Sequence, residues 1–368
     1  MLPLSRAELP EKIRRFGDPS APAPAKMLAA KGLVPVKGDD LVTLLVQLAA
    51  DPDPQVAGTA RVTLAELPEA VLAGACRAAL HPAILDGLLE HVGDRQPLLE
   101  ELAANRATPD ETVARIARTC DERTAERIAT DQERLLGAPA IIEALYKNRN
   151  TRMSTVDRLV ELAARNGVEL HGVATFQAHV EAIQGQLIVD EPTEEPLPDD
   201  VEFASALAED DDREPIDTDA VDGTEVVKDS HKPLAHKIAS MTTPQKIRLC
   251  LIGNAAARAI LVRDANKSVA MAAVSSPSMT DAEAARIAMS KQVSEDVLRY
   301  IGNRREWLGN YEVKRNLVFN PKTPSGISMR FLSHLRWNDL RALSRSKNVP
   351  VALRTAAAQR VAQKDKPN

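Results

Sequence analysis

The pentapeptide NPKTP, at residues 320–324, places two prolines and a threonine directly before an apolar run. The residue before a proline avoids the α region, so Asn320 and Pro321 predict the end of one helix. A threonine hydroxyl can cap a free backbone N–H, and proline suits the first helical position. Thr323 and Pro324 therefore predict the start of a second helix, which makes the pentapeptide a corner between two helices.

Three other stretches resemble this corner: NRATP at 105–109, NRNT at 148–151 and SPSMT at 276–280. Thr108 and Thr280 are each followed three residues later by a glutamate, which predicts a capping box at each helix start. The residues assigned to these helix corners are Asn105, Thr108, Pro109, Thr151, Thr280, Asn320, Pro321, Thr323 and Pro324.

The corners recur at a constant distance. Thr108 and Thr151 are 43 residues apart, and so are Thr280 and Thr323. A helical period of this length predicts stacked helical repeats, in which each unit buries its apolar face only against its neighbours. The alternative is that threonine–proline helix starts are common and that the equal spacings arise by chance.

The composition favours an all-α fold. Apolar residues make up 44% of the chain and aromatic residues only 3%, so the core must consist mainly of Leu, Ala, Val and Ile. Leu41, Leu44, Leu45 and Leu48 follow the three- and four-residue spacing of an amphipathic helix. Alternating β-branched runs, which would predict strands, are short. We expect an α-solenoid of helical repeats.

Charge divides the chain into segments. Residues 1–187 carry a net charge of −5, residues 188–230 carry −15 and residues 231–368 carry +15. A proline-rich stretch ends the first 25 residues. We therefore expect a flexible leader at 1–25, a helical-repeat domain at 26–187, an acidic linker at 188–230 and a basic helical-repeat domain at 231–368.

The acidic segment 188–230 is rich in proline and poor in apolar residues. Such a segment buries too little surface to offset its ordering entropy, so we expect it to be disordered, apart from a short helix around Val201–Leu207. Its charge is opposite to that of the segment that follows. We therefore hypothesise that it folds back and shields the basic domain.

The stretch DPDPQVAGTARVTLAELP, at residues 51–68, resembles the turn and second helix of a HEAT repeat. NPKTP and NRATPDETVARIA resemble the leucine-rich-repeat variant, and the chain as a whole resembles uncharacterised bacterial helical-repeat proteins. The resemblance implies an α-solenoid in two modules and supplies no cofactor. The 43-residue spacing is longer than the unit of the variant repeat, and the cysteine cluster that some such proteins use for an iron–sulfur centre is absent.

Catalytic and cofactor-binding motifs are missing from the sequence. HExxH, GxSxG, P-loop and GxGxxG patterns do not occur, and the seven histidines do not form metal-ligand pairs. Cys76, Cys120 and Cys250 lie far apart, which favours buried thiols in a reducing compartment. We expect a cytoplasmic protein that is not an enzyme, has no cofactor or metal, and does not insert into a membrane.

Basic residues are interleaved with aromatic residues in the last segment, around Trp307, Tyr311 and Trp337. This pattern is typical of surfaces that hold phosphates and stack on bases, although the aromatic side chains would equally serve as core anchors. The residues assigned to a surface for a polyanion or a partner are Arg304, Arg305, Lys314, Arg315, Lys322, Arg336, Arg341, Arg345 and Lys347.

Two hypotheses of function follow. The first is a non-enzymatic scaffold or adaptor that binds protein partners through helical-repeat surfaces, since stacked helices form extended concave surfaces. The alternative is a nucleic-acid-binding protein acting through basic residues 231–368, whose affinity would fall steeply with salt. The sequence identifies neither the partner nor the oligomeric state.

Overall fold

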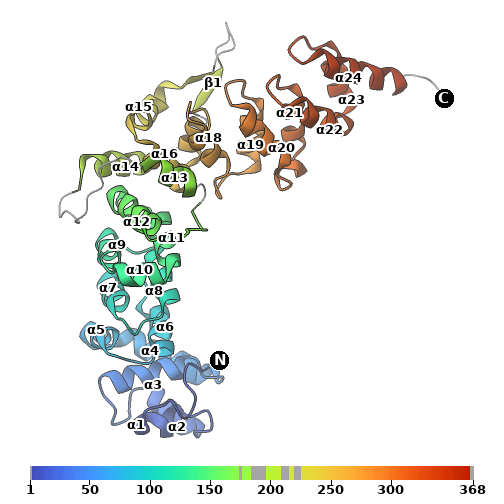
Figure 1. The fold of residues 1–368 in the computed structure, drawn as a ribbon. Coiled ribbons are helices and arrows are strands. Elements are labelled where there is room, and N and C mark those ends of the chain that lie inside the picture. The colour runs from blue at the N-terminus through green and yellow to red at the C-terminus, as the bar shows by residue number, and fades with distance from the viewer. Residues whose placement is uncertain (1, 174–175, 184–195, 209–214, 219–224, 365–368) are drawn as a thin grey trace. The chain divides into compact units, whose positions relative to one another are not determined.

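The computed structural model describes residues 2–173, 176–183, 196–208, 215–218 and 225–364. These residues form 24 α-helices, three short 3₁₀ helices and one two-stranded hairpin, so the expected all-α class is confirmed. The chain divides into two compact units, the first with the described residues up to Gly172 and the second with those from Val173 onward (Figure 1).

The first unit contains twelve helices in its described residues. They are α1 Glu11–Gly17, α2 Ala23–Ala30, α3 Asp39–Ala49, α4 Pro54–Glu66, α5 Glu69–Arg77, α6 Pro82–Val92, α7 Gln96–Ala104, α8 Asp110–Ala117, α9 Glu122–Ala129, α10 Gln132–Gly137, α11 Pro139–Lys147 and α12 Met153–Arg165.

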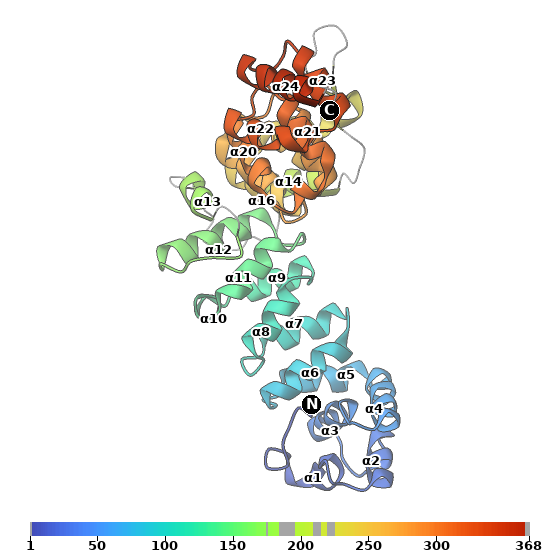
Figure 2. The same ribbon diagram turned by 90° about the vertical axis from the view of Figure 1, so that its right-hand side faces the viewer.

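Helices of the first unit pack against near neighbours in the chain. Helix α3 contacts α5, α5 contacts α7, and α7 contacts α9, while α4 contacts α6 and α8 contacts α11. Within this unit the helices follow one another in chain order in both views (Figures 1 and 2). The helix expected from the spacing of Leu41, Leu44, Leu45 and Leu48 is confirmed as α3. It is not amphipathic, however, because residues 42–49 are all buried and Leu41 is half-buried.

The second unit contains the remaining helices and the hairpin. They are α13 Phe176–Ile183, α14 Pro198–Ala208, β1 Ile216–Thr218, β2 Glu225–Val227, η1 Asp229–His231, α15 Lys232–Ser240, α16 Thr243–Ile252, α17 Ala255–Leu261, α18 Lys267–Val274, α19 Asp281–Met289, α20 Glu295–Asn303, η2 Trp307–Gly309, α21 Tyr311–Phe319, α22 Ser325–Phe331, η3 Leu332–His334, α23 Trp337–Arg345 and α24 Val351–Lys364.

Every second helix is again in contact in this unit. Helix α15 contacts α17, which contacts α19, which contacts α21, and α16 contacts α18, which contacts α20. Helix α13 contacts α16. Helix α13 therefore belongs to the second unit. The domain boundary expected at residue 187 lies outside the described residues.

Polar contacts between the helices have a nearly constant sequence separation. Many side-chain hydrogen bonds between neighbouring helices join residues 24 to 33 positions apart. Examples are Thr63 with Ala30, Thr112 with Asp86, Gly172 with Glu143, Arg258 with Glu283, Asn310 with Asp281 and Arg315 with Asp339. The 43-residue spacing of the corners is therefore not the packing period.

Asparagine, rather than threonine, defines the corners. Asn105, Asn148 and Asn320 directly follow α7, α11 and α21 in extended conformation. Each side-chain amide donates to two carbonyl oxygens 27 to 32 residues earlier, and each side-chain oxygen accepts a bond from the backbone N–H two residues later. The amide therefore joins two helix ends. The predicted helix end at Asn320 is confirmed.

The sequence suggested that the threonines at these corners cap the following helices. In the structure they do not. The buried Thr108 hydroxyl donates to the carbonyl of Leu102 in the preceding helix, 2.7 Å away. Pro109 and Pro324 are themselves the residues that precede α8 and α22. In all three corners the threonine backbone N–H instead closes a turn onto the asparagine carbonyl, which leaves the threonine side chain buried.

The corner at Thr280 does form the predicted capping box. The Thr280 hydroxyl accepts a bond from the Glu283 backbone N–H, and the Glu283 carboxylate accepts one from the Thr280 backbone N–H at 2.9 Å. Ser276 stands there in place of asparagine and lies buried. Its side chain is too short to reach across to another helix as the asparagine amides do.

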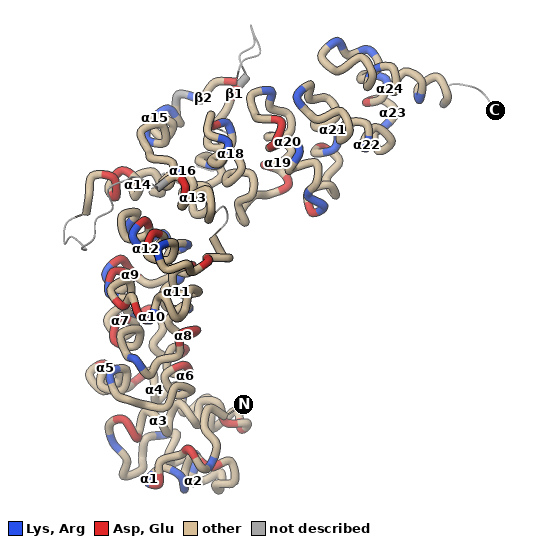
Figure 3. Tube along the Cα trace, viewed as in Figure 1, with Lys and Arg blue, Asp and Glu red and all other residues tan. Residues whose placement is uncertain are grey.

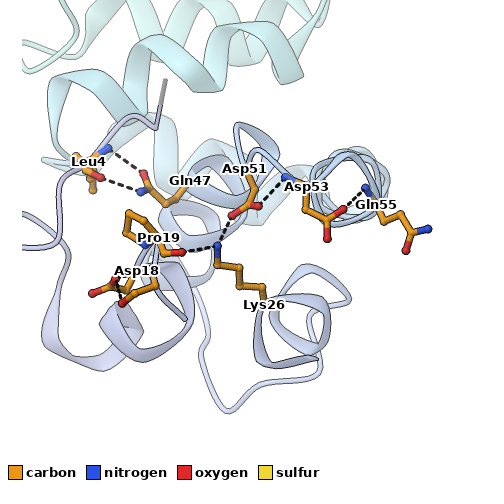
Figure 4. Close-up of polar contacts among 9 residues, drawn as sticks. Leu4, Asp18, Pro19, Lys26, Gln47, Asp51, Asp53 and Gln55 are labelled. Carbon is orange, nitrogen blue, oxygen red and sulfur yellow. Dashed lines mark hydrogen bonds and ion pairs between the residues drawn. The ribbon is translucent and has the colours of Figure 1, made fainter. Parts of the chain in front are cut away.

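Residues 2–25, expected to be a flexible leader, form α1 and the start of α2 and are held by buried polar contacts (Figure 4). The fully buried Gln47 side chain bonds both the backbone N–H and the carbonyl of Leu4, at 2.9 and 2.8 Å. Lys26 donates to the carbonyl of Pro19 and pairs with Asp51 at 2.8 Å. The proline-rich stretch is therefore a tight connection between two helices.

Part of the acidic segment 188–230, expected to be a disordered linker, is ordered. The short helix expected around Val201–Leu207 is confirmed as α14, whose Phe203 ring lies 5.0 Å from the guanidinium of buried Arg248. Residues 216–218 and 225–227 pair as an antiparallel hairpin. Residues 188–195, 209–214 and 219–224 lie outside the described residues.

Candidate functional site

The candidate site is the C-terminal basic surface, formed by the nine cationic residues singled out above. Arg304 and Arg305 follow α20, Lys314 and Arg315 lie on α21, Lys322 lies in the corner before α22, and the others lie on or beside α23. All are exposed except Lys314, which is half-buried. Residues 310–364 contain eleven Lys and Arg but only two Asp and Glu, and blue segments recur there in Figure 3.

Two of these residues are brought together where α21 meets α23. Arg315 pairs with Asp339 at 2.9 Å, and the Arg336 guanidinium lies over the Tyr311 ring, 4.4 Å from its centre. The Tyr311 hydroxyl accepts a bond from the Arg336 backbone N–H at 2.8 Å and donates to Asp339. These contacts tie the starts of the two helices together.

The electrostatics of this contact are set by one carboxylate. Burial acts to raise the pKa of Asp339, but hydrogen bonds from Tyr311 and Arg315 outweigh it, and the pKa lies below its ordinary value. Asp339 is therefore charged at neutral pH and neutralises Arg315. Arg336, held over a ring and with no ion pair among the described residues, keeps its charge available to a partner.

Arg304 is also held by aromatic side chains. Its guanidinium lies 5.9 Å from the ring centre of Tyr300 and 5.8 Å from that of Trp307, and it pairs with Glu306 at 3.1 Å. Trp307 is buried, with only 6% of its surface exposed. Trp307 is thus a core anchor and does not offer its face to a nucleic-acid base.

Six cations of the basic surface have neither an ion pair nor a side-chain hydrogen bond within the described ranges. They are Arg305, Lys314, Lys322, Arg341, Arg345 and Lys347. Arg341 and Arg345 are four residues apart on α23, so they project from the same helix face. No described contact joins Arg304 and Arg305 to the cations of α23. Arg341 and Arg345 therefore form the firmest group, while Arg336 and Lys347 flank α23 at its two ends.

Residues that could hold a metal or attack a substrate are not gathered in the part of the chain that the structure describes. No group of three or more His, Cys, Asp or Glu side chains there is placed to hold a metal ion. The three thiols are free and buried, as expected. Burial raises the pKa of Cys76 to about 11 and that of Cys120 to about 12, and it raises that of Cys250 as well, so the thiols are protonated and unreactive at neutral pH.

A second polar cluster was missed by the sequence analysis. Glu225, in the hairpin, pairs with Arg263 at 2.8 Å and accepts a 2.7 Å hydrogen bond from the Ser290 hydroxyl. A described part of the acidic segment thus contacts the basic domain. The only feature of the sequence that indicated a strand at this position was the pair of valines after Glu225. Arg263 and Ser290 follow helix ends that carry no motif.

Comparison of the chain with protein-family models and with curated proteins found no match to either. Among the described helices, none combines the length and the apolar character that crossing a bilayer requires.

Proposed function

We propose that this protein is a HEAT-like α-solenoid scaffold whose C-terminal basic surface binds an acidic protein partner. The serial contacts between helices 24 to 33 residues apart support the repeat architecture, because each helix pair depends on its neighbours for burial. The three free, buried thiols fit a protein of a reducing compartment.

The observation that carries the proposal is the set of exposed cations on and beside α23: Arg336, Arg341, Arg345 and Lys347. These cations are exposed and have no carboxylate partner among the described residues, apart from the Asp339 that Arg315 already neutralises. Charges of one sign on a surface repel one another, and a partner of opposite charge relieves that repulsion and speeds association. A partner with an acidic face fits this surface.

The second candidate function, nucleic-acid binding, draws on the same cations. Binding to single strands combines a cationic groove with exposed aromatic rings on which bases stack. Here Trp307 is buried, the Tyr311 ring is covered by Arg336, and the Tyr311 hydroxyl is engaged. Two of the three aromatic side chains are therefore used within the fold, and the third, Trp337, is half-buried, which favours the acidic protein partner.

The test compares two labelled probes, polyglutamate and a single-stranded oligonucleotide, on the full-length protein at several salt concentrations. The charge-reversed variant Arg341→Glu/Arg345→Glu/Lys347→Glu should bind polyglutamate about 5- to 150-fold more weakly, since three exposed charges each contribute roughly 0.3–1 kcal/mol. Binding by the native protein should weaken as salt rises, because ions screen exposed charges.

The matched control is Arg106→Glu/Arg118→Glu/Arg127→Glu, which changes the net charge equally. These three arginines are exposed in the first unit and have no ion pair among its described residues. The control should bind polyglutamate like the native protein. Equal losses in both variants, or no binding at low salt, would contradict the proposal. Tighter binding of the oligonucleotide than of polyglutamate would favour the second function.

A further inference from the structure

Glu225 is held by two segments of the second unit, Arg263 after α17 and residues 290–292 after α19. One oxygen accepts bonds from the Arg263 guanidinium at 2.8 Å and the Ser290 hydroxyl at 2.7 Å. The other accepts the Lys291 backbone N–H at 3.0 Å. The Glu225 main-chain carbonyl accepts the Gln292 side-chain amide at 3.0 Å. We call Arg263, Ser290, Lys291 and Gln292 the carboxylate site.

The residues of the carboxylate site also have contacts outside the hairpin. The Arg263 guanidinium also donates to the carbonyl of Ala259 on α17, which fixes its direction. Ser290 directly follows α19, is buried, and accepts the Gln292 backbone N–H at 3.2 Å, so its hydroxyl hydrogen is free to point at a carboxylate. Contacts outside the hairpin therefore help to orient both donors.

The charges are well matched and largely shielded from water. The side chains of Arg263 and Glu225 are only 14% and 11% exposed. Burial acts to raise the pKa of Glu225, but the hydrogen bonds from Ser290 and Arg263 and the Arg263 charge outweigh it, so the pKa is lowered. Glu225 thus binds as a carboxylate, and removing it would leave a buried guanidinium without a counter-charge.

The hairpin that carries Glu225 has little stability of its own. The hairpin has three residues in each strand, and an isolated two-stranded hairpin is marginally stable in water. Along β2, residues 225 and 227 are half-buried and Val226 is 49% exposed, the alternation of an extended strand with one face on a surface. Residues 225 and 227 therefore share the less exposed face of this strand.

We infer that the carboxylate site is a binding site for an extended acidic peptide segment of the pattern Glu-x-Val, which residues 225–227 of this chain occupy. A tethered occupant acts at an effective concentration in the millimolar range, so a partner segment of the same kind enters only when it out-competes the tether. The inference deepens the proposed function, because it gives the acidic segment a specific docking place on the basic domain.

The test uses the full-length protein and a fluorescent peptide with the sequence of residues 223–229, GTEVVKD. The variant Glu225→Ala should bind this peptide at least about tenfold more tightly than the native protein, because the tethered competitor is gone. The peptide GTQVVKD should bind that variant at least about tenfold more weakly, because truncating one partner of a shielded charge pair is costly. Adding Arg263→Gln to Glu225→Ala should return the affinity for GTEVVKD to that of the native protein.

A second measurement does not depend on the Arg263→Gln variant, and it therefore tests the inference even if that variant fails to fold. Hydrogen exchange at the Lys291 amide should accelerate in Glu225→Ala and slow again when the GTEVVKD peptide is added, since that N–H donates to the carboxylate. The matched control is Asp199→Asn, which removes one exposed charge from the same acidic segment and should leave peptide binding and exchange unchanged.

An unchanged affinity in Glu225→Ala, or equal binding of the two peptides, would overturn the inference. The variant Arg341→Glu/Arg345→Glu/Lys347→Glu separates it from the proposed function. With Glu225 in place, the triple substitution should weaken polyglutamate binding, and combined with Glu225→Ala it should leave GTEVVKD binding unchanged. Failure of the proposed function would thus leave the peptide result standing.

Discussion

At three helix corners, one asparagine side chain joins the ends of two helices. The Asn148 amide donates to the carbonyls of Ala117 and Cys120 at 2.9 Å each, and its oxygen accepts the Asn150 backbone N–H. Asn148 is 3% exposed, so these carbonyls have lost water and depend on the amide. Only a side chain with both donor and acceptor at this length meets all three bonds.

The substitution Asn148→Asp tests this role because it keeps the shape and the acceptor but removes the donor. A buried carboxylate facing two carbonyls should destabilise the first unit by about 2–4 kcal/mol. Urea unfolding followed by circular dichroism measures the loss. As a control, Asn166→Ala removes one exposed bond to Leu162 and should cost under about 0.5 kcal/mol. Comparable losses would refute the assigned role of Asn148.

At the scale of the helices, two helices can pack closely where one of them carries a glycine, which has no side chain. A Cβ atom at Gly302 in α20 would lie 2.7 Å from Ile327 Cγ2 in α22. Arg330, also on α22, donates to the Gly302 carbonyl, so the two helices are joined at this point. By contrast, a Cβ at Gly74 in α5 would meet nothing within 4 Å.

Two glycine-to-alanine substitutions should therefore have opposite effects. Gly74→Ala should stabilise the protein by about 0.5–1 kcal/mol, because alanine loses less conformational entropy in a helix. Gly302→Ala should destabilise it by about 1–3 kcal/mol, because overpacking outweighs that gain. Thermal unfolding of the two variants and the native protein measures both effects. A stabilising Gly302→Ala would show that α20 and α22 separate without cost.

At the scale of the whole molecule, the two units each bury their own core. In the first unit the described helices pack against near neighbours from α1 to α12. These contacts join helices that are close to one another in the sequence. The division at Gly172 thus marks a place where one set of local contacts ends.

A chain that ends at residue 172 should fold alone. It should retain the far-ultraviolet circular dichroism of a helical protein and unfold cooperatively in urea, because its core side chains contact one another. A chain ending at residue 129, after α9, provides the comparison. It lacks α11 and α12, which contact α8 and α9, and should unfold at lower urea concentration. A non-cooperative 1–172 fragment would contradict the division.

The sequence by itself determined the helical class, the ends of several helices and the separation of charge along the chain. Apolar periodicity, the capping box at Thr280 and the helix end at Asn320 are local, so the residues that cause them lie within a few positions. It also placed the cations of α21 and α23, since charge and exposure on a helix face follow from spacing.

Only the tertiary structure decided what distant residues do for one another. The amides of Asn105, Asn148 and Asn320 bond carbonyls 27 to 32 residues away, and Glu225 reaches Arg263 across 38 residues. Proline and threonine mark a corner locally, but they do not state which helix end lies beside it. The reason is physical: a buried polar group bonds the donor or acceptor that packing brings near, and packing is a property of the assembled helices.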